Sequence, residues 1–259
     1  NSSVTDITLP ESLTSIGNYA FSQSYITSIE IPHNVEYIGS FAFYGCSNLE
    51  TVKFNDNILS SDVKYVFSSC NKLNSVDLTN VKFLRQVTGS DNESVSSDFI
   101  VPFGTFKGCG NLQTVVLNND TVEISESAFE NCTSLVNINA ENVLKIDNNA
   151  FCKDESLGEI NLQSVESIGD DAFCNATALV KVALPQDKYV TVGARAFKGD
   201  YRLSDVNLDK IYSVDEESFS LTAITSCTVQ NIYLNSRRAF SAIYTLENLT
   251  VENLPSKVI

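Results

Sequence analysis

The chain has 259 residues, of which 43% are hydrophobic and 19% charged, and this composition is typical of an ordered soluble protein. Its 32 acidic residues outnumber its 17 basic residues, and the resulting net charge of -15 argues against binding to nucleic acid or to anionic membranes. No stretch approaches the roughly 18 apolar residues of a membrane span, so we expect no direct membrane insertion by this segment.

The chain opens on the strand part of a repeat unit, VTDITLP at residues 4–10. Whole units follow, such as IGNYAFSQSYITSIEI at 16–31, IGSFAFYGCSNLETVKF at 38–54 and IGDDAFCNATALVKVAL at 168–184. The last residues, LTVENLPSKVI, stop inside another unit. Neither end has an obvious polar cap and the chain contains no methionine, so we expect it to be a piece of a longer protein.

A phenylalanine marks each repeat unit, which we call a rung. Successive phenylalanines lie 21 to 24 residues apart, apart from one gap of 39. The ten are Phe21, Phe43, Phe67, Phe106, Phe129, Phe151, Phe173, Phe197, Phe219 and Phe240. One rung buries too little apolar surface to fold alone, so rungs must stack on one another. We therefore predict a column of ten stacked rings inside the protein.

Each rung combines extended and turn segments. Six residues after most phenylalanines a leucine begins the pattern L-x-x-I-x-L, which predicts a strand with alternate side chains pointing inward. A second extended segment ends at Ile or Val, often followed by Gly, and a small residue before the phenylalanine suggests a tight helical turn. The period predicts an α/β repeat solenoid, a leucine-rich-repeat right-handed superhelix of about ten rungs, forming a single domain over 1–259. We expect a parallel concave sheet, with short strands or helical turns on the convex side.

The gap of 39 residues between Phe67 and Phe106 places a loop insertion near residues 85–100, RQVTGSDNESVSSDFI. Insertions in solenoids protrude as loops, often on the binding side. This one could contribute to binding through Asp91, Asn92 and Glu93, or it could be a tolerated decoration.

The strand pattern also predicts which side chains face solvent. They are small or polar, and they lack the aromatic residues that dominate binding hot spots, so the face is either a weak, avidity-dependent binder or a solvated sheet. Our candidate binding residues on this face are Glu30, Lys53, Asp77, Glu159, Asn161, Lys181, Asp205, Asn207 and Asp209.

The seven cysteines fall in register with the repeat, four of them three residues after a phenylalanine: Cys46, Cys70, Cys109 and Cys132. They form no C-x-x-C pairs, so we expect free buried thiols, although a Cys46–Cys70 disulfide is sterically allowed. His33, the single histidine, is expected on a surface loop. Asp205, Asn207 and Asp209 are the one alternating acidic run, but adjacent rungs offer Lys181 and Ser226 in place of further cation ligands.

No acid, base and nucleophile fall together in this register, so we expect neither an enzyme nor a bound cofactor or metal.

The repeats resemble the BspA-like leucine-rich repeat family, whose template runs Ile-Gly-x-x-Ala-Phe-x-x-Cys-x-x-Leu-x-x-Ile-x-Leu-Pro. Residues 38–54 and 168–185 carry it almost whole, while the last five rungs lack the Cys. The resemblance implies a secreted or cell-surface protein of host-associated bacteria or anaerobic protists, implicated in adhesion. We therefore expect a monomeric, extracellular, non-enzymatic module that binds a host or microbial surface protein or glycan. The alternative is a structural spacer that projects another domain of a longer protein.

Overall fold

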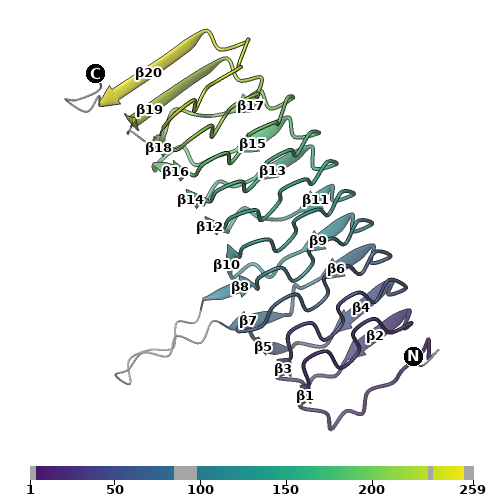
Figure 1. Ribbon diagram of the computed structural model, residues 1–259. Coiled ribbons are helices and arrows are strands. Elements are labelled where there is room, and N and C mark those ends of the chain that lie inside the picture. The colour runs from purple at the N-terminus through teal and green to yellow at the C-terminus, as the bar shows by residue number, and fades with distance from the viewer. Residues whose placement is uncertain (1–3, 85–97, 233–235, 254–259) are drawn as a thin grey trace.

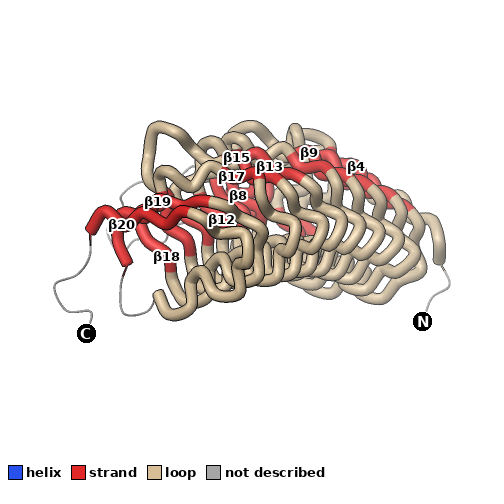
Figure 2. Tube along the Cα trace, turned by 90° about the horizontal axis from the view of Figure 1, so that it is seen from above, coloured by secondary structure: helices blue, strands red, loops and turns tan. Residues whose placement is uncertain are grey.

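The computed structural model describes residues 4–84, 98–232 and 236–253, and it shows an elongated β-solenoid of about ten turns (Figure 1). The described part of the chain runs from one end of the solenoid to the other (Figure 1). The described part contains strands and turns but no helix (Figure 2). The predicted repeat solenoid is thus confirmed, but its assignment to the α/β class is wrong.

One side of the solenoid, which we call the strand face, is formed by the predicted L-x-x-I-x-L strands. Five of them pair in parallel: β2 (Ser28–Ile31), β4 (Thr51–Phe54), β6 (Ser75–Asp77), β9 (Thr114–Val116) and β11 (Asn137–Ile138). Three more form a separate parallel sheet: β13 (Glu159–Asn161), β15 (Lys181–Ala183) and β17 (Asp205–Val206). Within the described residues, no hydrogen-bonded pairing joins β11 to β13, so the strand face is interrupted between them.

A second side is formed by the shorter extended segments, joined in the last two rungs by the longer strands over 226–232 and 248–253, which begin at the L-x-x-I-x-L positions and continue onto this side. β1 (Ser15–Ile16) pairs with β3 (Tyr37–Ile38). A ten-stranded sheet then contains β5 (Ile58–Ser60), β7 (Lys82–Leu84), β8 (Phe99–Val101), β10 (Thr121–Ile124), β12 (Lys145–Ile146), β14 (Ser167–Ile168), β16 (Val190–Val192), β18 (Ile211–Val214), β19 (Ser226–Ile232) and β20 (Asn248–Asn253). Its recorded strand pairings are parallel except that of β7 with β8.

The antiparallel pair β7–β8 marks the place of the predicted insertion. Leu84 at the end of β7 lies opposite Phe99 at the start of β8. The intervening residues 85–97 lie outside the described part of the chain. The proposed role of Asp91, Asn92 and Glu93 therefore stays a prediction.

The third side, which we call the turn wall, is formed in each rung by the residues from two before to two after the phenylalanine. Helical turns were predicted here, and that prediction is wrong. The residues two before and two after the phenylalanine have positive φ in all ten rungs, and a right-handed helix requires negative φ. In the rung of Phe151, the N–H groups of Asn149, Phe151 and Lys153 donate to carbonyls of the next rung at 2.7–2.9 Å. The intervening N–H groups of this rung close single turns by bonding to the carbonyl three residues earlier, rather than four residues earlier as in an α-helix.

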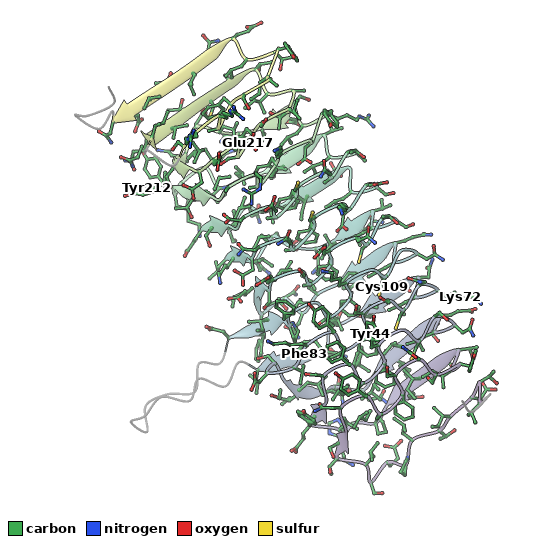
Figure 3. The ribbon with its side chains drawn as sticks, viewed as in Figure 1. Tyr44, Lys72, Phe83, Cys109, Tyr212 and Glu217 are labelled. Atoms are coloured by element: carbon green, nitrogen blue, oxygen red, sulfur yellow. The ribbon has the colours of Figure 1, made fainter. Side chains whose placement is uncertain are left out.

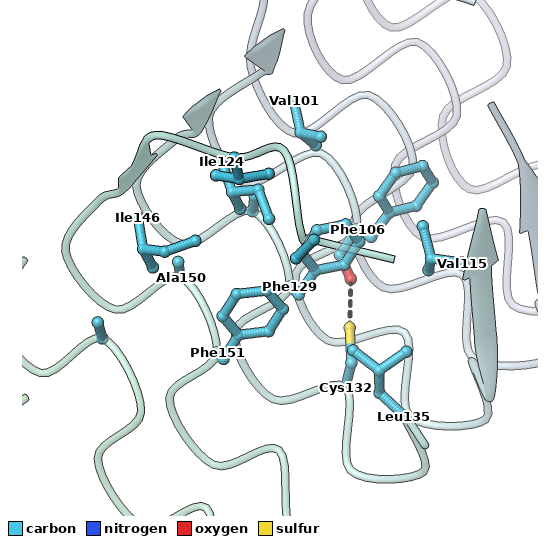
Figure 4. Packing of buried hydrophobic residues seen from close by; sticks show 14 of the residues in the cluster. Val101, Phe106, Val115, Ile124, Phe129, Cys132, Leu135, Ile146, Ala150 and Phe151 are labelled. Atoms are coloured by element: carbon cyan, nitrogen blue, oxygen red, sulfur yellow. Dashed lines mark hydrogen bonds between the residues drawn. The ribbon is translucent and has the colours of Figure 1, made fainter. Parts of the chain in front are cut away.

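The predicted column of phenylalanines is confirmed (Figure 4). Neighbouring rings stack with centroids 5.0–5.8 Å apart and planes 2–11° from parallel. The eight inner rings are fully buried, and Phe21 and Phe240 at the two ends are partly buried. Each inner ring contacts a ring on both sides, so neighbouring rungs stabilise one another.

The recurring Ile-Gly pair has a steric cause. A Cβ at Gly169 would lie 2.5 Å from Asn148 Oδ1 and 2.7 Å from the Asn148 nitrogen. Asn148 Oδ1 accepts a hydrogen bond of 2.8 Å from the N–H of Asp170, the residue after the glycine. The same arrangement recurs where Asn18 lies against Gly39. Glycine is therefore required because the preceding rung occupies the space of its side chain.

Replacing Gly169 with alanine should lower the free energy of unfolding by about 1–3 kcal/mol, because the added methyl overlaps backbone atoms of the preceding rung. Gly158→Ala is the matched control, since a Cβ there meets nothing within 4 Å. Urea unfolding of both variants measures the difference. Equal stabilities would contradict this explanation of the Ile-Gly pair.

Candidate binding surface

The strand face has the side-chain alternation that the sequence predicts. In β13, Glu159 and Asn161 are exposed and Ile160 between them is buried. The same alternation holds in β2, β4 and β6. Side chains therefore project to solvent in rows that run from rung to rung (Figure 3).

Three of the predicted binding residues come together in one hollow of this face. It has a volume of about 530 Å³, and Glu159, Asn161 and Lys181 line it together with residues of β9 and β11. Val115, Ile138 and Ile160 also line it. We call this hollow the strand-face trough. It spans the interruption between β11 and β13, so it combines apolar side chains with polar groups from four rungs.

The rung of Phe129 explains the hollow. It carries Ala140 where neighbouring rungs carry Leu117 and Leu162, so this rung has a smaller inward side chain. Asn139 turns back toward the preceding rung, where its Oδ1 accepts from the Leu117 N–H at 2.6 Å and its Nδ2 donates to the Leu117 carbonyl at 3.2 Å. Ile138 is left half-buried. The trough is therefore explained by the small side chain of Ala140 and by the Asn139 amide, which bonds to the preceding rung.

Two valines at the trough were not among our candidate binding residues. Val116 is 37% exposed and Val136 is 46% exposed, and both line the hollow. An apolar residue at an outward strand position was the available sequence signal for Val116. Val136 lies just before β11, where the repeat template does not fix its direction. Single exposed apolar residues are ordinary, but these two valines lie in the lining of one hollow together with other apolar side chains.

The remaining predicted residues lie outside the trough. Lys53 Nζ lies 2.6 Å from Glu30 Oε1, and this hydrogen bond lowers the pKa of the exposed Glu30 carboxyl. Asp77 Oδ1 accepts a hydrogen bond of 2.9 Å from the Thr79 N–H, which closes the turn after β6. Lys53 and Asp77 line a second, smaller hollow of about 250 Å³ on the strand face, and both side chains are also engaged within the chain.

The acidic run after β17 does not form a cation site. Lys181 Nζ lies 3.4 Å from Asp205 Oδ2, and Asn207 Oδ1 accepts from the Asp209 N–H at 3.1 Å. Among the residues that the structure describes, no cluster of three His, Cys, Asp or Glu side chains could hold a metal. Lys181 and the turn thus engage one carboxylate oxygen of Asp205 and the amide oxygen of Asn207.

All seven cysteines are free thiols, and all but the half-buried Cys174 are buried. In four rungs the thiol donates to the carbonyl of the phenylalanine one rung earlier, as Cys132 does to Phe106 at 3.2 Å (Figure 4). Burial raises the pKa of Cys132. His33 is exposed, with Nδ1 3.0 Å from the Asn55 carbonyl, as expected for a surface loop. Five of the cysteines belong to the hydrophobic core, whereas the prediction of buried thiols is wrong for the half-buried Cys174.

Two aspartates were not predicted to be buried, although they lie three residues after a phenylalanine, where earlier rungs have a cysteine. Asp154 and Asp200 are fully buried. Their Oδ1 atoms accept from the N–H groups of Cys132 at 2.8 Å and Ala176 at 2.9 Å. Their Oδ2 atoms have no hydrogen-bond partner. Burial raises the pKa of both carboxyls well above the ordinary value.

The sequence matches the family described as BspA type leucine-rich repeat region (6 copies) over residues 1–90, 99–187 and 144–258. The chain belongs to this family. BspA-type repeats thus cover nearly the whole sequence on both sides of the predicted insertion, as the resemblance indicated. No curated protein matches the chain. Within the described residues of this BspA-type chain, no helix has the length and apolar character needed to cross a membrane.

Several solved structures are similar to this BspA-type chain. A leucine-rich repeat protein from Bacteroides ovatus is 22% identical, with 93% of this chain and 78% of that one covered and a TM-score of 0.47. The leucine-rich repeat protein TpLRR of T. pallidum is 24% identical, with 74% and 72% covered and a TM-score of 0.47. A leucine-rich cell surface protein from Faecalibacterium prausnitzii is 19% identical, with 96% and 86% covered and a TM-score of 0.39.

Proposed function

We propose that this chain is a non-enzymatic binding module of a secreted or cell-surface protein, and that the strand-face trough contacts a protein or glycan partner. Membership of the BspA-type family supports a repeat module that binds or provides structure. The observation that carries the binding role is the trough itself, a hollow of about 530 Å³ within a sheet of otherwise small polar side chains.

The chemistry of the trough suits a modest, mixed contact. Its volume lies within the usual range of ligand sites, and its apolar residues lie beside a carboxylate, an amide and an ammonium group from Glu159, Asn161 and Lys181. It contains no Trp, Tyr or Arg, the residues that dominate strong hot spots. A single contact should therefore be weak, and several copies on one surface would bind through avidity.

The test is a double variant, Val116→Asp with Val136→Asp. Two carboxylates in the trough should weaken binding by about tenfold or more, because they replace apolar contact with charges that must be desolvated. Leu144→Asp is the matched control, since Leu144 is as exposed as Val116 but does not line the trough. Binding of the purified chain to arrays of matrix proteins and glycans measures the effect. An equal loss in the control would count against the trough.

The spacer remains the alternative. It predicts that binding of intact cells is unchanged by the double variant, by deletion of residues 85–100, and by charge reversal of Asp205 and Asp209. A binding module predicts that at least one of these changes reduces cell binding.

A further inference from the structure

The turn wall carries a second hollow, away from the strand face, which we call the outer groove. It has a volume of about 540 Å³ and is formed by the residues one and two positions after the phenylalanine in four rungs, together with aromatic residues at one end. It runs from Tyr44 to Lys153, four rung spacings apart, or roughly 19 Å at ~4.8 Å per rung. The groove is therefore long enough for an extended ligand.

The floor of the groove is low because its side chains are small. Gly108 lines the groove and has no side chain. In the preceding rung Ser69 has a short side chain, and the buried Ser68 donates to the Lys107 carbonyl at 2.9 Å. Later rungs place Asn131 and Lys153 at the corresponding positions, and they close the far end.

The near end is aromatic. Tyr19, Phe41 and Tyr65 form a stack on the outer surface, with Phe41 4.9 Å from Tyr19 and 5.1 Å from Tyr65 between ring centroids. Tyr44 meets Phe41 at an interplanar angle of 74° (Tyr44 is labelled in Figure 3). Because both faces of Phe41 are covered, its edge must meet Tyr44, and the other face of Tyr44 has no stacked ring among the described residues.

The middle and the far end of the outer groove are polar and have a net positive charge. Lys107 Nζ lies 2.7 Å from Glu130 Oε2, which also accepts from Ser127 Oγ at 2.7 Å. Lys153 is exposed and makes no ion pair with any residue that the structure describes. Two lysines against one glutamate give the groove a net charge of +1 in a chain of -15. This local reversal of sign favours an anionic ligand of low charge density.

We infer that the outer groove binds an acidic oligosaccharide, a chain of pyranose rings in which some units carry a carboxylate. The apolar face of one sugar packs on Tyr44, and hydroxyl groups bond to Ser69 and Asn131. A carboxylate pairs with Lys153. The repeat of a β-linked pyranose chain is close to the rung spacing, so successive sugars meet successive rungs. Dense polyanions are disfavoured because the rest of the surface is acidic.

The test uses a hyaluronan hexasaccharide, which alternates a uronic acid with an N-acetylhexosamine, and titration calorimetry. Tyr44→Ala should weaken binding at least about fivefold, and Lys153→Glu at least about tenfold. Tyr201→Ala and Lys72→Glu change exposed residues outside the groove and should leave binding unchanged. Methyl esterification of the hexasaccharide should weaken binding and remove the difference between the native chain and Lys153→Glu.

Three results would overturn the proposal. The native chain could bind a neutral β-glucan hexamer as well as the acidic one, the control variants could lose as much affinity as the groove variants, or a poly-glutamate peptide could bind equally well. The last result would assign the groove to acidic peptides. Thermal unfolding of each variant excludes loss of fold as the cause. Because the trough variants change a different face, failure here and failure of the proposed function can be told apart.

Discussion

Replacing Phe151 with alanine should lower the free energy of unfolding by about 3–5 kcal/mol, the usual cost of removing a buried aromatic ring. Phe151 is fully buried and stacks on Phe129 at 5.4 Å and on Phe173 at 5.2 Å. The variant therefore loses ring contacts on both sides as well as the burial of its own side chain. Chemical unfolding followed by circular dichroism measures the loss.

Phe240→Ala is the matched control for this prediction. Phe240 is partly buried and stacks on a single described ring, Phe219, at 5.8 Å, so its replacement should cost clearly less. Hydrogen exchange should also locate the damage, because in a solenoid each rung contacts only its neighbours. Protection should fall around Phe129, Phe151 and Phe173 and persist in distant rungs. Equal costs at both positions would contradict a column stabilised rung by rung.

The repeat pattern made the core predictable because one physical requirement recurs in every rung. A ring that must stack on the next ring, and a strand that must pair with the next strand, fix the register of side chains without knowledge of the whole fold. This is why the alternation of Glu159, Ile160 and Asn161 could be predicted from spacing. It is also why the four cysteines that lie three residues after a phenylalanine could be placed in the core.

The conformation of the turn wall could not be predicted because every second backbone N–H group there donates to a carbonyl of the next rung, not of its own rung. A small residue before the phenylalanine, such as Ala150, fits either a helical turn or the observed turn. The choice depends on N–H groups such as that of Phe151 finding the carbonyl of Ala172, 21 residues later. Residues with positive φ there include Tyr65 and Lys153, which give no sequence signal of left-handed backbone. The outer groove depends on this geometry and was missed with it.

The strand-face trough was predicted only in part for a related reason. The repeat assigned Glu159, Asn161 and Lys181 to one exposed face, but every rung offered similar residues. What distinguishes this place is a deviation from the repeat, namely Ala140 in a leucine position and the interruption between β11 and β13. Patterns predict what rungs share, whereas a site arises where one rung differs.

Asp154 is such a deviation in the core, and Asp154→Asn should stabilise the protein at pH 7, because the folded chain must keep protonated a buried carboxyl that the unfolded chain ionises. By its place in the column, the asparagine Nδ2 can donate toward the Phe129 carbonyl, as thiols do in other rungs. Its Oδ1 can keep the bond from the Cys132 N–H. Thermal unfolding of the two chains measures the gain.

The gain should depend on pH, and the sign follows from proton binding. Burial raises the pKa of Asp154 well above its ordinary value of 3.8, and the charge of nearby Glu130 adds to the effect. As pH rises above about 4, the unfolded chain releases this proton before the folded chain does, so native stability falls until pH passes the folded pKa. The asparagine cannot ionise. Its advantage should therefore be small at pH 4 and grow toward pH 7.

Asp187→Asn removes the same charge from an exposed loop and should show no such trend. A pH-independent difference between Asp154→Asn and the native chain, or a variant less stable than the native chain at pH 7, would refute the buried neutral carboxyl. Asp200→Asn should repeat the result, because Asp200 has the same burial and an unpartnered Oδ2. The two sites lie two rungs apart with Ala176 between them, so their effects should be nearly additive.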